Sequence, residues 1–505
     1  MYKYEDMFMI KKLIYVLFLV FSVIIFNSLV PKESYAIPPF AQKYHFTCAV
    51  CHTTFPNLNP FGRAFWRNGF RLPNTNGMAA DATQIVEGLS LPNPWPVPLS
   101  IAPIISYQHY TNENVNSSTD SFSGLIMFDA GGEFKLYTPF AQSLSFFSMN
   151  NIPSGGNFKE VQLWASLNGL GHGFGIPSHL FNLKIGQVNT AAAYFDKQVP
   201  FYLIAPGANA TGPDSNIQGL EVGYDGEGDM LIDNMMNSGV ELYGTPGYHL
   251  WYKITATNDG GMPNMKTLMA YPSEADSNII AANQVSNAME YSYQLKEYYP
   301  TSMGQLEFGY YGATIGEPIY VSPMSNMSGG SWTNRIVDNG VDVDLANDVY
   351  ELGLTYMVQS DNHPYGNPSI SPTNLTLNGT TVGNTNSSNG YSTFEVYGRY
   401  LFPQIGNGLM LSAEYAQYSW THKDLQEGFN QTFGGVLLGC PSNSKLYQQG
   451  FYTPNGSGCS NEGIKDNLDL LAEYSLASNA HLYLEYIIAN ESQDNTIGTG
   501  LAFGF

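Results

Sequence analysis

Most of this chain alternates apolar and polar residues with a period of two, and that pattern constrains its fold more than any other feature. Leu306, Phe308 and Tyr310 flank Glu307 and Gly309, for example. Similar runs recur at 220–224, 352–356, 394–399, 409–415 and 482–486. Counting such runs gives about 16 strands of ~10 residues, the length with which a tilted strand crosses a bilayer. We therefore expect an antiparallel outer-membrane β-barrel in a mainly β chain.

The composition agrees with alternating strands that face lipid on one side and water on the other. Only 12% of residues are charged, aromatics reach 14%, and the chain holds 35 Tyr and 51 Gly. A disordered chain would lack the aromatics. The excess of 42 Asp and Glu over 20 Lys and Arg argues against nucleic acid as a partner. A secreted soluble solenoid or sandwich would explain the strands, but not their lengths or the asymmetry of their connections.

The connections between the runs are of two lengths, as in outer-membrane barrels. Short turns are expected at 244–247, 403–408 and 478–479, and long loops at 259–288, 361–391 and 424–464. Residues 316–347 fit this scheme only if Trp332 to Val337 is a strand that turns at Asn339-Gly340. The alternating end of the chain, Leu501 to Phe505, predicts a last strand that closes the barrel.

The first residues have the order of a secretory signal peptide. Lys11 and Lys12 precede an apolar run over 13–30, and the small-residue site Ser34-Tyr-Ala36 follows. We expect cleavage after Ala36, although the run is long enough for an uncleaved anchor helix. The predicted organisation is a signal peptide over 1–36, a small separate segment over 37–95, and the barrel over 96–505. The Pro-rich stretch 92–98 would act as a stiff connector.

The strongest chemical motif is Cys48-Ala-Val-Cys51-His52, since Cys-x-x-Cys-His is the attachment signature of c-type haem. The two thiols would add to the haem vinyl groups, and His52 would be the proximal iron ligand. A bare Cys-x-x-Cys could also be a redox disulfide or half of a zinc site. The adjacent His and the export signal favour one covalently attached haem c. We therefore expect residues 37–95 to form a small haem-bearing segment resembling cytochrome c.

For the sixth ligand, His45 and Met78 are the candidates within 37–97. If the attachment segment were helical, His45 would share a face with His52 and could not reach the distal side. Met78 can return over the haem and is our tentative distal ligand, because a thioether raises the iron potential. The alternative is a ligand supplied by the barrel, or none.

A helix is expected after the motif, capped by Asn59, with Pro60 at its first position and an end near Gly69. Arg63, Arg67 and Arg71 recur at four-residue spacing on it. They are candidates for contacts with the haem propionates, for pairing with inward glutamates, or for a solvated charged face. Those glutamates are Glu221, Glu307, Glu395, Glu414 and Glu485. They could attract ferrous ions, but we favour plain hydration or pairing with an Arg such as Arg399.

Two further predictions concern packing. About 60 residues can scarcely cover a haem alone, so the aromatic segment around the motif should pack into the mouth or lumen of the barrel; a tethered periplasmic domain is the alternative. Cys440 and Cys459 lie in a Gly, Ser and Asn-rich stretch of an exported chain, which favours a loop disulfide over a metal pair.

Residues 37–70, IPPFAQKYHFTCAVCHTTFPNLNPFGRAFWRNGF, resemble the fused monohaem cytochrome–porins of iron-oxidising bacteria. The likeness rests on the haem motif and the Phe-Pro-x-Leu-x-Pro-Phe-Gly-Arg run; beyond it, only the architecture and terminal Phe505 agree. The resemblance implies an outer-membrane Fe(II) oxidase with its loops facing the exterior. It would pass single electrons to a periplasmic cytochrome or copper protein, and the acidic composition suggests the acidophile type. Cys48, Cys51 and His52 carry over to the family motif, whereas Met78 does not.

Two other functions stay open at this point. One is a solute porin whose haem-bearing plug senses or gates, and the other is an electron conduit for a donor other than Fe(II).

Overall fold

The structure, a computed structural model, describes residues 46, 50–54, 57–72, 83–86, 89–91, 99–112, 117–136, 138–153, 159–189, 236–258, 289–321, 330–362, 374–384, 386–422, 424–425, 453–454, 459–460, 466–477, 480–489 and 494–503. Several sequence predictions fall outside these residues. They are the signal peptide over 1–36, the connector over 92–98, the strand at 220–224 with Glu221, and the residues His45, Cys48, Met78, Cys440 and Phe505. The predicted disulfide therefore lies outside the described side chains.

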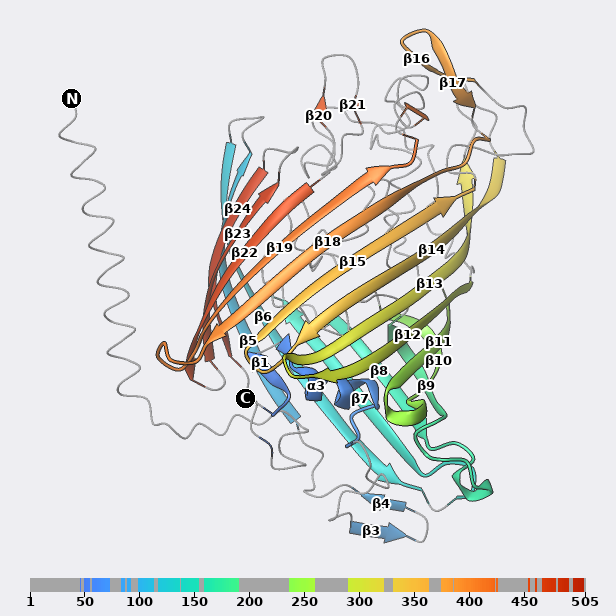
Figure 1. Cartoon of the computed structure of the whole chain (residues 1–505), viewed down its shortest axis with the longest axis vertical. Helices are drawn as coiled ribbons and strands as arrows, with labels where there is room; N and C mark the ends of the chain where they lie inside the picture. The colour runs from blue at the N-terminus through green and yellow to red at the C-terminus, as the bar shows by residue number, and fades with distance from the viewer. Residues whose placement is uncertain are drawn as a thin grey trace, which may run out of the picture.

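Sixteen antiparallel strands form one closed barrel, which confirms the predicted fold (Figure 1). The strands are β5 (Leu99–Asn112), β6 (Ser117–Lys135), β7 (Ser143–Pro153), β8 (Lys159–Asn168), β9 (Asn182–Asn189), β10 (Met236–Gly244), β11 (Leu250–Asn258), β12 (Met289–Thr301), β13 (Gly304–Val321), β14 (Gly330–Ala346), β15 (Tyr350–Asp361), β18 (Asn389–Phe402), β19 (Leu409–Trp420), β22 (Asp466–Ala477), β23 (Ala480–Ala489) and β24 (Asp494–Phe503). The last strand, β24, pairs with the first, β5, so the chain end closes the barrel as expected. Closure excludes the soluble solenoid and the sandwich.

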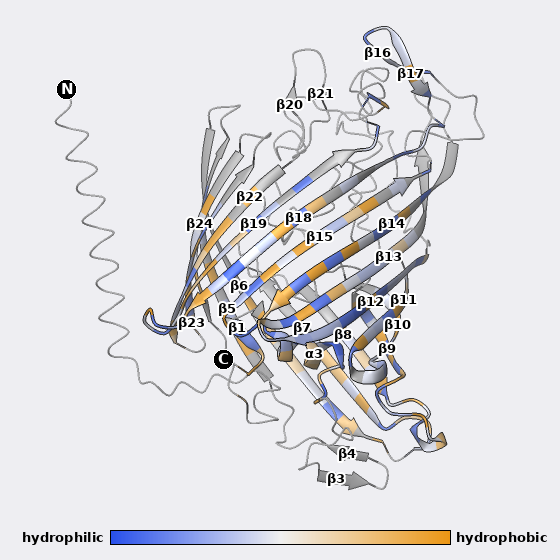
Figure 2. Cartoon of the chain, viewed as in Figure 1, coloured by the Kyte–Doolittle hydropathy of each residue, from blue (hydrophilic) through white to orange (hydrophobic). Residues whose placement is uncertain are grey.

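The alternation in the sequence corresponds to the two faces of the barrel wall: apolar residues lie on the outer face and polar residues on the inner face. Leu352, Leu354 and Tyr356 of β15 are exposed on the outside, while Glu351 and Thr355 are buried inside. Apolar and polar positions alternate visibly along β13, β14 and β15 (Figure 2). A barrel with an apolar outer wall and a polar interior is the architecture of porin-like proteins of the outer membrane.

The two ends of the barrel differ as the sequence predicts. At one end β10 meets β11 through the one-turn 3-10 helix η4 (Pro246–Tyr248), and β18 meets β19 through residues 403–408. Long segments at the other end separate β11 from β12, β15 from β18, and β19 from β22. Within two of these lie the small hairpins β16–β17 (Asn374–Leu377 and Thr380–Asn384) and β20–β21 (Thr453–Pro454 and Cys459–Ser460).

One predicted turn is wrong. Trp332 to Val337 is indeed strand, but Asn339 and Gly340 lie inside β14, which runs on to Ala346. Gly340 pairs with Tyr311 of β13, and a Cβ at Gly340 would overlap the Tyr311 ring. The glycine therefore makes room for the inward ring of Tyr311 and does not form a turn. Asn-Gly indicates a turn only where its backbone is not hydrogen-bonded to a neighbouring strand.

Between the signal region and the barrel lie short elements: β1 (His52–Thr54), β2 (Asn57–Leu58), the helix α3 (Pro60–Arg67), and a hairpin of β3 (Thr83–Val86) and β4 (Leu89–Leu91) that we did not predict. α3 and β1 lie inside the barrel, enclosed by its wall, toward the end with the short turns (Figure 1). Among the described residues, no helix is long and apolar enough to cross a membrane.

Candidate functional site

The segment that follows the cysteine motif is a compact unit, here called the plug and defined as residues 50–54 and 57–72. Its helix α3 begins as predicted, with the Asn59 side chain accepting a hydrogen bond from the Gly62 N–H at 2.9 Å. It ends in a Schellman motif, in which the Phe70 N–H donates to the Phe65 carbonyl and the Gly69 N–H to the Trp66 carbonyl. Gly69 has a φ of +68°, the left-handed conformation that favours glycine at this position.

Asn59 also holds the cysteine motif against the helix. Its backbone N–H donates to the Cys51 carbonyl at 2.9 Å, and its side-chain Nδ2 donates to the Val50 carbonyl at 3.1 Å. A Cβ at Gly62 would overlap the Cys51 carbonyl oxygen, so glycine permits this close approach. The thiol-bearing backbone is thus fixed to the first turn of α3.

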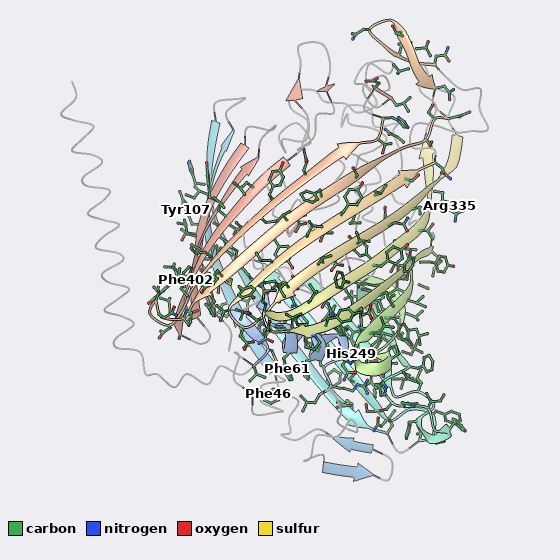
Figure 3. All side chains as sticks on the ribbon, viewed as in Figure 1. Phe46, Phe61, Tyr107, His249, Arg335 and Phe402 are labelled. Carbon is green, nitrogen blue, oxygen red and sulfur yellow. The ribbon has the colours of Figure 1, made fainter. Side chains whose placement is uncertain are left out.

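His52 itself lies in extended backbone, because β1 pairs with β2 and places His52 opposite Leu58. The attachment segment is not helical at His52, so the premise behind our argument against His45 does not hold there. Cys51 and His52 are both partly exposed, whereas Leu58 and Asn59 beneath them are buried. Phe46, just before the cysteine motif, is in edge-to-face contact with Phe61 of α3, with ring centroids 6.0 Å apart (Figure 3).

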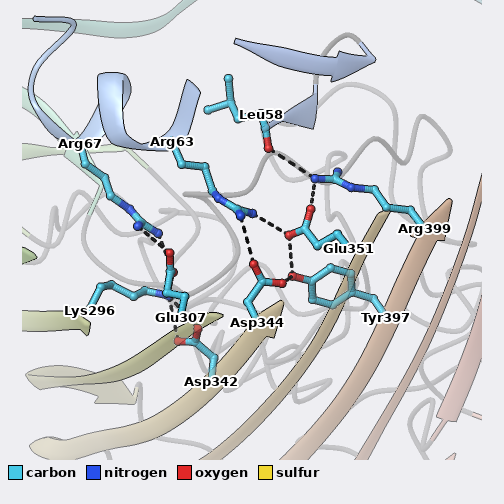
Figure 4. A network of polar contacts seen from close by, with 10 residues as sticks. All are labelled: Leu58, Arg63, Arg67, Lys296, Glu307, Asp342, Asp344, Glu351, Tyr397 and Arg399. Carbon is cyan, nitrogen blue, oxygen red and sulfur yellow. Dashed lines mark hydrogen bonds and ion pairs between the residues drawn. The ribbon is translucent and has the colours of Figure 1, made fainter. Parts of the chain in front are cut away.

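Arg63 anchors the plug to the barrel wall. Its Nη1 donates to Glu351 Oε1 at 2.6 Å, and its Nη2 lies 3.2 Å from Asp344 Oδ2. Tyr397 links these two carboxylates, donating to Asp344 Oδ1 at 2.6 Å and contacting Glu351 Oε1 at 2.9 Å. Arg399 adds an ion pair with Glu351 (Figure 4). Arg63 has an exposed fraction of 0%, so the alternative of a solvated charged face is excluded.

Arg67 makes a second anchor one helical turn later. Both of its terminal nitrogens bind Glu307, and Lys296 reaches the same carboxylate at 3.2 Å. Asp342 completes the cluster by accepting from Lys296 at 2.8 Å (Figure 4). The indole Nε1–H of Trp251 donates to the Arg67 carbonyl at 3.2 Å. This is the pairing with inward glutamates that was one of our three alternatives.

Arg71 lies beyond the end of α3, so the arginine stripe on the helix consists of Arg63 and Arg67 alone. The Arg71 Nη2 donates to Asn182 Oδ1 of β9 at 2.7 Å. Its exposed fraction is 4%. Three arginines of the plug therefore contact three different parts of the inner wall. Contacts of Arg63 and Arg67 with haem propionates stay a prediction; in this structure both guanidinium groups face wall carboxylates.

A row of aromatic rings runs from the plug to strand β8 of the barrel wall. Phe61 stacks on Phe65, Phe65 contacts Phe70 edge-on, and Phe70 stacks on Trp164 of β8 with centroids 5.7 Å apart. Next to it, Lys184 of β9 pairs with Glu241 at 2.6 Å. The ammonium of Lys184 lies 5.9 Å from the Trp66 ring centroid and 5.0 Å from that of Trp164. Apolar packing and desolvated charge thus both hold the plug in the barrel, as the lumen prediction required.

The other inward glutamates behave differently from Glu307. Glu395, Glu414 and Glu485 are buried as predicted. Both carboxylate oxygens of Glu395 lack a hydrogen-bond partner among the described residues. Arg399, expected near such residues, pairs instead with Glu351. In the described parts of the chain, no three His, Cys, Asp or Glu side chains are arranged to hold a metal ion.

Several residues of the site were missed by the sequence reasoning, among them Asp344, Glu351, Tyr397, Lys296 and Trp251. Strand parity could have marked Glu351 as inward, since it precedes the outward Leu352. No sequence signal says which inward carboxylate lies beside which arginine, because that depends on barrel closure.

Comparison with known proteins adds little to this picture. No family model matches the sequence, and no curated protein matches it. Among solved structures, OprB of Pseudomonas putida at high pH is similar, with 9% identity, a TM-score of 0.47, and coverage of 83% of this chain and 94% of that chain. A mutant of the Rh. blastica porin has 11% identity, a TM-score of 0.39, and coverage of 81% and 100%. Identities and TM-scores this low carry no argument about what this chain does.

Proposed function

We propose that this chain is an outer-membrane c-type cytochrome that oxidises extracellular Fe(II) and passes single electrons to a periplasmic cytochrome or copper protein. One observation carries the proposal: the helix α3, to which the backbone of Cys51 is tied through Asn59, is fixed inside the barrel by the buried ion pairs of Arg63 and Arg67. A signature for covalent haem is thereby held at a fixed place inside a membrane pore. Iron as the donor rests on the family resemblance of residues 37–70.

The residues present fit a covalent haem. Cys51 and His52 are both partly exposed, and His52 begins the strand β1 that pairs with β2. Phe46, Phe61 and Phe65 provide apolar cover next to them. Cys48 would supply the second thioether. When bound, the haem would take up and release one electron at a time.

The protein's own residues fix where that exchange takes place. Short turns lie on the periplasmic side of outer-membrane barrels and long loops outside, and the plug is at the short-turn end. The haem would then lie near the periplasmic acceptor, with the polar lumen leading to it from outside.

The test uses the purified full-length protein in detergent. We expect a porphyrin that stays bound after denaturation and extraction, and a visible spectrum that changes from ferric to ferrous on addition of Fe(II) at low pH. His52→Ala should abolish this reduction. A protein without bound porphyrin, or reduction kinetics unchanged in His52→Ala, would eliminate the proposal.

A solute porin with a haem-bearing plug is the second candidate, because a barrel of this strand number can enclose an aqueous channel. Planar-bilayer conductance separates the two. We expect low conductance from the intact protein and a marked rise in Arg63→Ala/Arg67→Ala, which releases the plug. High solute conductance in the unmodified protein would favour the porin. Rapid reduction by another donor, with no reduction by Fe(II), would favour a conduit for that donor.

A further inference from the structure

His481 is a buried histidine of the barrel wall to which the site described above assigns no role. It lies at the start of β23, where Tyr483 and Glu485 are also buried and Leu484 is exposed, so its side chain points into the barrel. Its exposed fraction is 4%. Among the described histidines, no other lies on an inward position of a barrel strand. His109 shares the parity of the outward Ile101 and Ile105 on β5.

Of the two ring nitrogens of His481, Nδ1 has polar neighbours and Nε2 has no hydrogen-bond partner among the described residues. Nδ1 lies 3.1 Å from Glu473 Oε1 and 3.3 Å from the Ser475 Oγ. Nε2 is buried and has no hydrogen-bond partner in the described structure. The hydrogen bond of Nδ1 is to the Ser475 hydroxyl, and the Glu473 carboxylate lies next to it. A proton on Nδ1 leaves the lone pair on Nε2, the nitrogen through which an imidazole with such neighbours can bind a metal. A buried imidazole nitrogen without a partner costs stability unless something binds it.

The position of His481 brings it to the plug. Only two residues separate β22 from β23, so His481 lies at the barrel end that holds α3. Its partner Glu473 is within electrostatic reach of Arg399. Arg399 in turn donates to the Leu58 carbonyl at 3.4 Å. Leu58 is the residue opposite His52 in the β1–β2 pair. The motif histidine and Glu473 are therefore both neighbours of the Arg399 region of the wall.

We propose that His481 Nε2 is the second axial ligand of the haem attached through Cys48, Cys51 and His52. The inference rests on the proposed function, because it needs the haem. It makes the barrel wall part of the cofactor site and gives Glu473 the role of a positioning residue. It also replaces Met78 as the distal ligand.

Met410 is a competing ligand on β19, and it also serves as a control. Met410 has an exposed fraction of 0% and pairs with Glu473 across β19 and β22. Its thioether therefore lies on the same part of the inner wall as His481. Only one of the two side chains should affect the iron if the assignment is right.

The experiment compares the visible and electron paramagnetic resonance spectra of the full-length protein with those of four variants: His481→Ala, His481→Met, Met410→Leu and Met78→Leu. The mass of the bound porphyrin is measured in each. His481→Ala should turn the low-spin ferric spectrum into a high-spin one that added imidazole restores. His481→Met should stay low-spin, gain the weak red band of thioether ligation and raise the reduction potential. Met410→Leu and Met78→Leu should change nothing.

Loss of the low-spin spectrum in Met78→Leu or Met410→Leu, or an unchanged spectrum in both His481 variants, would overturn the assignment while leaving the bound haem in place. Absence of porphyrin mass from the unmodified protein would instead remove the proposed function itself. Glu473→Gln adds a separate readout. With haem retained, it should raise the reduction potential, because the imidazole loses the carboxylate that makes it a stronger donor.

Discussion

Arg67 and Glu307, 240 residues apart in the sequence, form a two-point ion pair inside the barrel. Arg67 Nη1 lies 2.8 Å from Glu307 Oε2, and Nη2 lies 2.7 Å from Oε1. Planar guanidinium and carboxylate groups fit each other in this arrangement, which a lysine cannot reproduce. Both side chains are almost completely removed from solvent, so the pair fixes the angle of α3 against β13 as well as its position.

Removing the carboxylate of this pair should loosen the plug. Glu307→Gln leaves the Arg67 charge buried with no carboxylate bound to it, a change that costs about 3–5 kcal/mol in buried pairs. Hydrogen exchange of the α3 amides should therefore become faster, while the barrel strands distant from the plug keep their protection. Arg335→Gln is the control, since Arg335 is an exposed arginine of β14. Equal exchange in the two variants would show that the ion pair does not hold the helix.

Asn59 should have two separable roles, as helix cap and as the tie to the cysteine motif. Asn59→Asp keeps the oxygen that caps Gly62 but loses the Nδ2 donor to the Val50 carbonyl. Asn59→Ala loses both and should cost a further ~1 kcal/mol of helix stability. We expect normal α3 protection but a lower yield of porphyrin-bearing protein in Asn59→Asp, and a decrease in both quantities in Asn59→Ala. Identical behaviour of the two variants would contradict the division.

Gly340 should be intolerant of a side chain because of Tyr311. Gly340→Ala forces its Cβ into the Tyr311 ring, and overpacking of this kind typically costs about 1–3 kcal/mol. Adding Tyr311→Leu should recover most of the loss, so the two changes should be strongly non-additive. Denaturant unfolding of the barrel in detergent measures all three variants. Strict additivity would mean that the ring and the glycine do not depend on each other.

His179, in the connection between β8 and β9, should titrate below an ordinary histidine. Burial, and next the charge of Arg71, lower the pKa of His179. The folded state therefore disfavours the protonated imidazole, so the contribution of His179 to stability is full above pH ~6.5 and decreases as the pH falls through its lowered pKa. In an NMR titration, Arg71→Gln should raise the pKa of His179 only part of the way, since the effect of burial remains. No change in that variant would exclude the influence of Arg71.

The sequence alone determined the elements and their faces. A period of two is a property of each strand by itself, so the count of about 16 strands, the inward glutamates and the closing last strand could be read residue by residue. The limits of α3 were equally local, because Asn59, Pro60 and Gly69 act on their own backbone and its immediate neighbours. The haem motif is likewise a matter of adjacent residues.

Tertiary structure decided the rest, because it depends on which strands meet when the barrel closes. The alternation marks both Glu307 and Glu395 as inward. Only the strand register and the position of α3 in the barrel decide that Arg67 binds Glu307 and not Glu395. Asn339-Gly340 carries a local turn signal that strand pairing with β13 overrides. Long-range pairing sets these contacts, and no window of neighbouring residues contains that information.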